Sequence, residues 1–392
     1  TYIHDVNMCR FLLYVGVDPL TVAEVVTQPR HSLCRQTLWS AQLVTGFAVH
    51  LDGCGLGWYS LHEDDQLPCV FTSMSPAHNN ANLHRLAKAT RSRMFMTHVR
   101  SATTGSLSEA NCHPFAAGKL LFMHNGSVGA FSAGVKRKLL ASLRDDIYGG
   151  ILGSTDSEHI FALFLNTFPQ GTDFDHLDLV PADLLAALYE TVAQLNAWEA
   201  EAAADRGVDF VSYLNIAISD GTTSIATRYV SRNGVMSDSD PSVSLYFATG
   251  SRIASVPAPD AKPGDALTDC TMVTENKTPS LVVIASEPLW DSDDWLAVPQ
   301  NTAMVVTSQI DVWCLPMLDA TAVPTHRVLP RSGSTRIFSE SHNWIDATPP
   351  TSPLSAAAGS FAFPPALLGS PVGLGVSGAA VVDPLDPLAG FT

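Results

Sequence analysis

The order of apolar patterns along the chain is the feature that most restricts its fold. Short apolar runs of strand length occupy residues 9–17, 93–102 and 119–128. Helical patterns follow at 136–145, 154–168 and 182–203, and strand-like runs resume at Phe210. This strand-helix-strand order predicts an α+β fold in which two sheets share one core and the helices lie outside.

Two local signals mark element boundaries in the middle of the chain. Thr155 and Glu158 have the spacing of a capping box, in which each residue satisfies a free backbone N–H of the other at the start of a helix. Asp220-Gly221 separates two strand-like runs and predicts a hairpin.

Near the N-terminus, Asp18-Pro19 is expected to end the first strand, because proline interrupts regular pairing. Gly53, Gly55 and Gly57 interrupt a second apolar stretch. Such glycines indicate a sharp turn or a close approach between strands.

Composition argues against several classes of function. The 392 residues carry a formal net charge of −16, from 22 Lys and Arg against 38 Asp and Glu, which disfavours a nucleic-acid partner. The sequence has no uninterrupted apolar run of the roughly 18 residues that would indicate a membrane span. Seven cysteines make an odd number without a CxxC pair, which favours a reducing, cytoplasmic compartment over a disulfide framework or a zinc site.

The chain divides into three predicted segments. Residues 1–8 are expected to be a leader that the mature protein lacks, and residues 9–320 form one domain. Residues 348–392 are rich in Pro, Gly, Ala and Ser and are predicted to be a mostly disordered tail.

Several strand-like runs end in polar residues, the arrangement expected of a site built on a rigid sheet. Five stretches stand together in the sequence: Cys9-Arg10, GCGLGWY (53–59), THVRSATTG (97–105), NCHPF and MHNGSV (111–115 and 123–128), and GSTDSE (153–158). In this order they resemble the class II glutamine amidotransferase domain of the N-terminal nucleophile hydrolase superfamily, over residues 9–320. The resemblance implies a four-layer αββα sandwich and hydrolysis of an amide by a cysteine.

Within that superfamily, MCRFLLYVG (8–16) and GSTDSEHIFALFL (153–165) are similar to the motifs of the amidotransferase-like subunit of the glutathione degradosome (DUG pathway). This resemblance implies hydrolysis of the γ-glutamyl bond of glutathione to glutamate and Cys-Gly. It also implies a metallopeptidase-like partner subunit with β-propeller repeats. Two other functions stay open: hydrolysis of glutamine or another γ-glutamyl substrate, and a catalytically silent scaffold subunit.

Cys9 is the candidate nucleophile. A thiolate that forms a thioester divides amide hydrolysis into two easier steps. If Cys9 is the first residue, its α-amine, with a reference pKa of about 7.7 to 8.0, can accept the thiol proton. Met8 stands directly before it, so we expect either initiation at Met8 or removal of a short propeptide. The alternative is a buried strand cysteine without a chemical role.

The family resemblance assigns Asn125 and Gly126 to the oxyanion hole, as a side-chain amide donor and a backbone N–H donor. Preorganised donors of this kind stabilise the tetrahedral intermediate of amide hydrolysis. An ordinary Asn-Gly hairpin turn is the alternative interpretation of this pair.

Arg100, Thr103 and Asp156 are the candidate substrate-binding residues. A γ-glutamyl group carries a free α-carboxylate and a free α-ammonium, so its recognition needs one cation and one anion. Arg100 offers a planar fork to the carboxylate, assisted by Thr103, and Asp156 pairs with the ammonium. The alternatives are a strand-end surface arginine and an acid that stabilises the first turn of a helix.

Three histidines, His98, His113 and His124, also lie in these motifs. They lack the short spacings of His-rich metal sites, so we interpret them as structural, hydrogen-bonded side chains. Neither a metal ion nor a cofactor is predicted.

Overall fold

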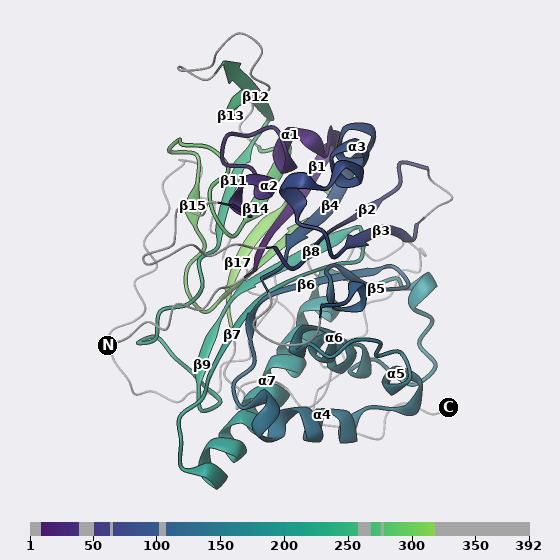
Figure 1. The fold of residues 1–392 in the computed structure, drawn as a ribbon, viewed down its shortest axis with the longest axis vertical. Helices are drawn as coiled ribbons and strands as arrows, with labels where there is room; N and C mark the ends of the chain where they lie inside the picture. The colour runs from purple at the N-terminus through teal and green to yellow at the C-terminus, as the bar shows by residue number, and fades with distance from the viewer. Residues whose placement is uncertain are drawn as a thin grey trace, which may run out of the picture.

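A computed structural model describes residues 9–38, 51–62, 66–101, 107–257, 268–275 and 278–317. The predicted leader and the predicted tail lie outside these residues. The described part contains two large antiparallel sheets with helices on both outer sides (Figure 1).

The first sheet has the strand order β15-β11-β14-β1-β4-β2-β3. Strand β1 therefore lies inside this sheet, between β14 and β4, and Arg10 opposes Val99 at the beginning of β1. The strand bounds are β1 Arg10–Thr21, β2 Cys54–Tyr59, β3 Pro68–Ser73, β4 Arg91–Val99, β11 Tyr246–Gly250, β14 Leu281–Ala285 and β15 Leu296–Ala297.

The second sheet has the order β10-β9-β7-β8-β16-β17, with β6 paired to β7 and to β5. Its bounds are β5 Phe115–Ala117, β6 Leu120–Ser127, β7 Val211–Ser219, β8 Thr223–Arg228, β9 Val230–Arg232, β10 Val235–Met236, β16 Thr302–Thr307 and β17 Val312–Pro316. A separate hairpin of β12 (Arg252–Pro257) and β13 (Thr268–Val273) extends from the body at the top of Figure 1. The hairpin predicted at Asp220-Gly221 is confirmed as the β7–β8 connection.

Seven helices cover the two sheets in the described part of the chain. The first three are α1 (Ala23–Val26), α2 (Leu33–Gln36) and α3 (Ala81–Ala89). The other four are α4 (Lys136–Ser142), α5 (Asp145–Tyr148), α6 (Asp156–Asn166) and α7 (Pro181–Arg206). One apolar core joins the first sheet to α1–α3, and another joins the second sheet to α4–α7. The predicted four-layer αββα architecture is therefore confirmed.

A third core fills the space between the two sheets, and we call it the inter-sheet layer. Its members include Phe11, Leu13, Met96, Met123 and Ile284. Successive strand residues point to opposite faces, so the residues two positions further along each strand point into the same layer. This periodicity carries Cys9, His98, Asn125 and Ser286 toward one end of the inter-sheet layer.

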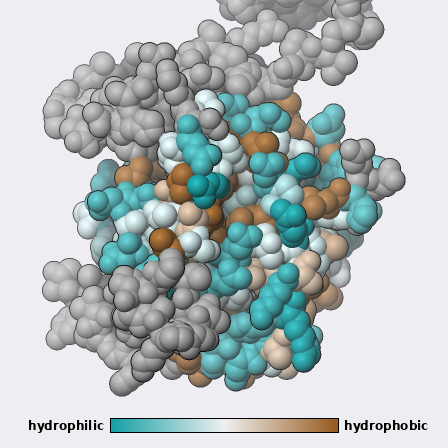
Figure 2. Space-filling model, turned by 90° about the horizontal axis from the view of Figure 1, so that it is seen from above, coloured by the Kyte–Doolittle hydropathy of each residue, from teal (hydrophilic) through white to brown (hydrophobic). Residues whose placement is uncertain are grey.

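The face of the molecule seen from above is mixed in character (Figure 2). On the face seen from above, hydrophilic side chains are interspersed with separate hydrophobic ones (Figure 2). In the part of the chain that the structure describes, no helix has both the length and the apolar composition needed to cross a membrane.

Two expectations for the first sheet need correction. Asp18-Pro19 does not end β1, which continues to Thr21 after a register shift between Val15 and Leu20. The shift leaves the proline outside the regular ladder, where its missing N–H costs little. The glycine-rich stretch is a continuous strand rather than a sharp turn, and the close approach is real: a Cβ on Gly55 would lie 2.1 Å from the His113 carbonyl oxygen.

Half of the predicted capping box is present at the start of α6. The Glu158 N–H donates to Thr155 Oγ1 at 3.3 Å, as predicted. The Glu158 carboxylate, however, accepts from the Leu152 and Gly153 N–H groups at 2.8 and 2.7 Å. In a capping box, this carboxylate would accept from the backbone N–H of Thr155. Here the N–H groups of the preceding loop donate to it instead.

We expect Thr155→Ala to lower the free energy of unfolding by about 1 kcal/mol, because the variant loses the helix cap. Urea unfolding followed by circular dichroism measures the change. Thr172→Ala is the control, since it removes a threonine hydroxyl bond at an exposed turn. An unchanged stability of Thr155→Ala would show that the cap contributes nothing.

Candidate functional site

Cys9 lies immediately before β1, and its thiol contacts the segment that follows β4. The Ser101 N–H donates to Cys9 Sγ at 3.3 Å, and the thiol donates to the Ser101 carbonyl oxygen at 3.5 Å. Burial raises the pKa of the Cys9 thiol above its ordinary value, opposed by the Ser101 hydrogen bond and by the charge of Arg100. The thiol is therefore protonated near pH 7, so a nucleophile at this position needs a base.

Arg100 lies directly after β4 and interacts electrostatically with the thiol of Cys9. Its positive charge lowers the pKa of Cys9. The residue is only 3% exposed, and its backbone N–H donates to the Gly53 carbonyl oxygen at 2.8 Å. The interpretation of Arg100 as a surface residue at a strand end is therefore wrong.

Asp156 is the first residue of α6. Its negative charge raises the pKa of the Cys9 thiol, the opposite of the effect of Arg100. One carboxylate oxygen accepts from the Val128 N–H and the other from the Ser157 N–H, both at 3.0 Å. Asp156 thus stabilises the first turn, as the alternative interpretation holds, and also ties the helix to the end of β6. One cation and one anion therefore act electrostatically on the Cys9 thiol.

Asn125 and Gly126 lie inside β6, opposite Asn215 and Leu214, so the hairpin-turn interpretation is wrong. Asn125 is fully buried, and its Nδ2 donates to Ser286 Oγ at 3.3 Å. Gly126 has no room for a side chain, because a Cβ would lie 1.8 Å from the Tyr213 carbonyl oxygen. The remaining predicted residue, Thr103, lies outside the described residues.

Ser286, directly after β14, links Asn125 to the strand of the cysteine. Its Oγ accepts from the Phe11 N–H at 3.0 Å as well as from Asn125 Nδ2. Its backbone N–H donates to the Phe11 carbonyl oxygen at 3.0 Å. The polar residue after one strand therefore contacts both the first and the second sheet.

Glu287 forms a buried ion pair beside the cysteine. Its Oε1 accepts from Arg10 Nε at 2.7 Å, and its Oε2 lies 3.0 Å from His31 Nε2. Arg10 Nη1 in turn donates to the Cys9 carbonyl oxygen at 3.1 Å. The backbone of the cysteine is thus held through Arg10 by a carboxylate that is 0% exposed.

Arg10, Ser286 and Glu287 have no role in the sequence-based interpretation, although one signal was present. The apolar run LVVIA (281–285) ends in the polar pair Ser286-Glu287, as other site-forming strands end in polar residues. Only the strand order shows that this run lies next to β1. That neighbour is distant in sequence and could not be deduced from the motif itself.

The three motif histidines are buried and hydrogen-bonded. His113 Nδ1 lies 2.9 Å from His98 Nε2. His124 Nε2 lies 3.0 Å from the Tyr213 carbonyl oxygen, which can only accept, so Nε2 carries the proton and Nδ1 accepts from Ser157 Oγ at 2.9 Å. Burial lowers the pKa of His124, which stays neutral near pH 7. Among the described residues, no group of three or more His, Cys, Asp or Glu side chains is arranged to hold a metal ion.

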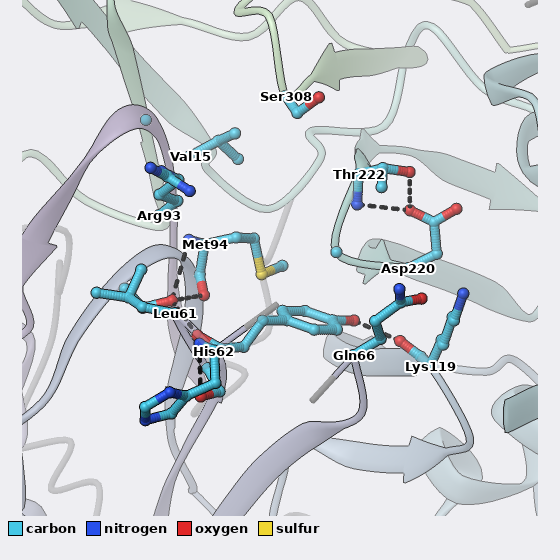
Figure 3. A pocket seen from close by; sticks show the side chains of 15 residues that line it. Val15, Leu61, His62, Gln66, Arg93, Met94, Lys119, Asp220, Thr222 and Ser308 are labelled. Atoms are coloured by element: carbon cyan, nitrogen blue, oxygen red, sulfur yellow. Dashed lines mark hydrogen bonds between the residues drawn. The ribbon is translucent and has the colours of Figure 1, made fainter. Parts of the chain in front are cut away.

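A cavity of about 380 Å³ lies at the opposite end of β1 and β4, and its lining includes Val15, Met94 and Asp220 (Figure 3). Val15 is roughly 20 Å along β1 from Cys9 at about 3.3 Å per strand residue. Asp220 Oδ1 accepts from the Thr222 N–H at 2.8 Å, within the protein. None of the predicted site residues that the structure describes lines this cavity. The cavity is therefore distinct from the candidate site around Cys9.

Comparisons with known proteins identify the family of the chain. The chain matches the family of class-II glutamine amidotransferases over residues 32–222. It is 36% identical over 312 residues to the probable glutamine amidotransferase DUG3 of Saccharomyces cerevisiae, across 77% of this chain and 82% of that protein. The chain therefore belongs to the class-II glutamine amidotransferases, and the resemblance in its motifs is confirmed.

Two further likenesses are more distant. The chain is 30% identical over 160 residues to the gamma-glutamyl-hercynylcysteine sulfoxide hydrolase of Mycolicibacterium smegmatis, across 38% of this chain and 68% of that protein. A solved structure of a glutamine aminotransferase class-II domain protein from Silicibacter pomeroyi is 22% identical, with a TM-score of 0.48. That likeness covers 79% of this chain and 100% of the other.

We expect Glu287→Ala to lower the free energy of unfolding by about 3 to 5 kcal/mol, because Arg10 keeps its buried charge and loses this carboxylate. Urea unfolding measures the loss. Glu275→Ala is the control: its ion pair with Arg252 is exposed on both sides, so a loss below about 1 kcal/mol is expected. Equal losses in the two variants would contradict a stabilising role of the buried pair.

We expect His124 to make the fold less stable at acid pH. Its folded pKa lies below the ordinary value of 6.5, so the unfolded chain binds the proton first and the contribution of His124 is lost as pH falls below 6.5. His124→Gln keeps a donor near Nε2 and does not titrate, so its unfolding free energy should fall less between pH 7.5 and pH 5.5. His62→Gln, at an exposed position, should follow the wild type.

Proposed function

We propose that this chain hydrolyses γ-glutamyl amide bonds with Cys9 as the nucleophile, and that glutathione is its substrate. The observation that carries the proposal is that the positive charge of Arg100 and the negative charge of Asp156 both act on the Cys9 thiol, with opposite effects on its pKa. A γ-glutamyl head group presents the complementary pair, an α-carboxylate and an α-ammonium. In this role Arg100, with Thr103, binds the carboxylate and Asp156 the ammonium.

In the proposed mechanism, Cys9 Sγ attacks the γ-carbonyl carbon and the thiol proton passes to the α-amine of Cys9. Asn125 Nδ2 and the Gly126 N–H donate to the oxyanion that forms. The C–N bond then breaks, and the leaving nitrogen takes the proton from the α-amine of Cys9. Cys-Gly departs and a thioester remains on Cys9. Water hydrolyses the thioester, releasing glutamate and the free thiol. The raised pKa of Cys9 supports the need for a base in this scheme.

One relative supports a γ-glutamyl substrate in which cysteine is part of the leaving group. The name of the Mycolicibacterium hydrolase describes a γ-glutamyl compound of a cysteine derivative. Glutathione is likewise a γ-glutamyl compound of cysteine. The motif resemblance further leads us to propose a cytoplasmic complex with a metallopeptidase-like partner subunit that carries β-propeller repeats.

The experiment offers glutathione and glutamine separately to protein that begins at Cys9, alone and with such a partner. We expect glutamate and Cys-Gly from glutathione, and loss of this turnover to background in Cys9→Ala. Cys314→Ala, which removes a buried cysteine from β17, is the control and should keep the activity. Ammonia from glutamine with no Cys-Gly from glutathione would replace the proposal by a glutaminase function.

The same assay tests the base. Protein that retains Met8 has an amide in place of the Cys9 α-amine, so we expect its turnover to fall to the level of Cys9→Ala. Full turnover with Met8 attached would contradict the α-amine mechanism. Absence of turnover in every form, with or without the partner, would favour a scaffold subunit.

A further inference from the structure

We propose that Ser286 is a positioning residue that holds the side-chain amide of Asn125 in the orientation needed to donate to the oxyanion. The inference rests on the proposed function, in which Asn125 is that donor. Ser286 itself is 1% exposed and follows a strand of the first sheet, whereas Asn125 belongs to the second.

The position of Ser286 is fixed by contacts on both sides of its backbone. Its N–H donates to the Phe11 carbonyl oxygen at 3.0 Å. Its carbonyl oxygen accepts from Ser244 Oγ at 2.9 Å. Its hydroxyl oxygen accepts from the Phe11 N–H at 3.0 Å. The two backbone bonds fix the main chain of Ser286, and the third fixes its side chain. The hydroxyl oxygen therefore offers Asn125 an acceptor at one defined point.

The bond to Asn125 matters because of the geometry of a side-chain amide. The terminal torsion of asparagine is broad, so packing alone orients the amide plane weakly. An amide nitrogen carries two N–H groups, and the 3.3 Å bond to Ser286 Oγ uses one of them. Fixing that N–H fixes the direction of the second, and oxyanion donors are effective because they are oriented before the reaction.

Ser286 also relates the donor to the nucleophile. The same oxygen accepts from Asn125 and from Phe11, which lies two residues after Cys9. Attack by Cys9 and stabilisation by Asn125 must occur around one carbonyl group, and misplacement by about 1 Å can cost about 10²-fold in rate. Because Ser286 Oγ accepts from both residues, it holds the Asn125 amide in a fixed position relative to the strand that follows Cys9.

The test is a double-mutant cycle of Ser286→Ala and Asn125→Ala, measured on glutathione and on glutamine. We expect Ser286→Ala to lower kcat about tenfold or more with KM changed less than about twofold, because orientation of the donor matters mainly in the transition state. If Ser286 acts through Asn125, the double variant should be no slower than Asn125→Ala. Independent, multiplying losses would overturn the proposal.

Two measurements separate positioning from general damage. Alkylation of Cys9 by iodoacetamide, followed by mass spectrometry, passes through no oxyanion and should proceed in Ser286→Ala at the wild-type rate. Slowed alkylation would instead show that Ser286 supports β1, and would overturn the proposal. Ser92→Ala removes a buried serine hydroxyl at the other end of β4, where it donates to the Tyr59 carbonyl oxygen, and it should keep the wild-type kcat.

A crystal structure of Ser286→Ala tests the proposal without activity. We expect the Asn125 amide to be rotated or to occupy more than one orientation, and an unchanged single orientation would overturn the proposal. If the wild type hydrolyses neither substrate, the proposed function fails, whereas this structural comparison still decides whether Ser286 orients Asn125. Should Ser286→Ala not fold, Ser286→Cys, similar in size with a weaker acceptor, takes its place in every measurement.

Discussion

Packing of the two sheets against each other is the constraint on which the site depends. Strand periodicity sends alternate residues of β1, β4, β6 and β14 into the inter-sheet layer. The layer is apolar along most of its length, and it becomes polar where Cys9 and Asn125 continue the same periodicity. The candidate site is therefore the polar end of a core, and the core determines how its groups face one another.

Burial and the charges around Cys9 shift the pKa of its thiol, some upward and some downward. Burial disfavours the thiolate, and Asp156 disfavours it further, whereas Arg100 and Arg10 favour it. In the proposed function, Arg100 and Asp156 bind the zwitterionic head group while the thiol of Cys9 is still neutral. In the proposed function, the proton then moves only when a base and a substrate are both present.

Much of the fold and site could be predicted from the sequence, because the informative patterns are local. Apolar runs of strand length located β4 and β6, and the family resemblance of the motifs at their ends led to Arg100 and Asn125. The roles of Ser286 and Glu287 could not be predicted, since they depend on β14 lying beside β1, a pairing across more than half of the described chain. The carboxylate of Glu158 was assigned to the wrong donors because loop N–H groups competed for it.

The division of the site between the two sheets has a consequence for folding. Cys9 and Arg100 border strands of the first sheet, while Asn125 belongs to the second. Each sheet can form its own hydrogen-bond ladder, but neither contains a complete set of groups for the proposed reaction. A partly folded chain with intact strands and separated sheets would keep its circular dichroism and be inert. Turnover is thus a more sensitive reporter of sheet docking in this protein than its secondary-structure content.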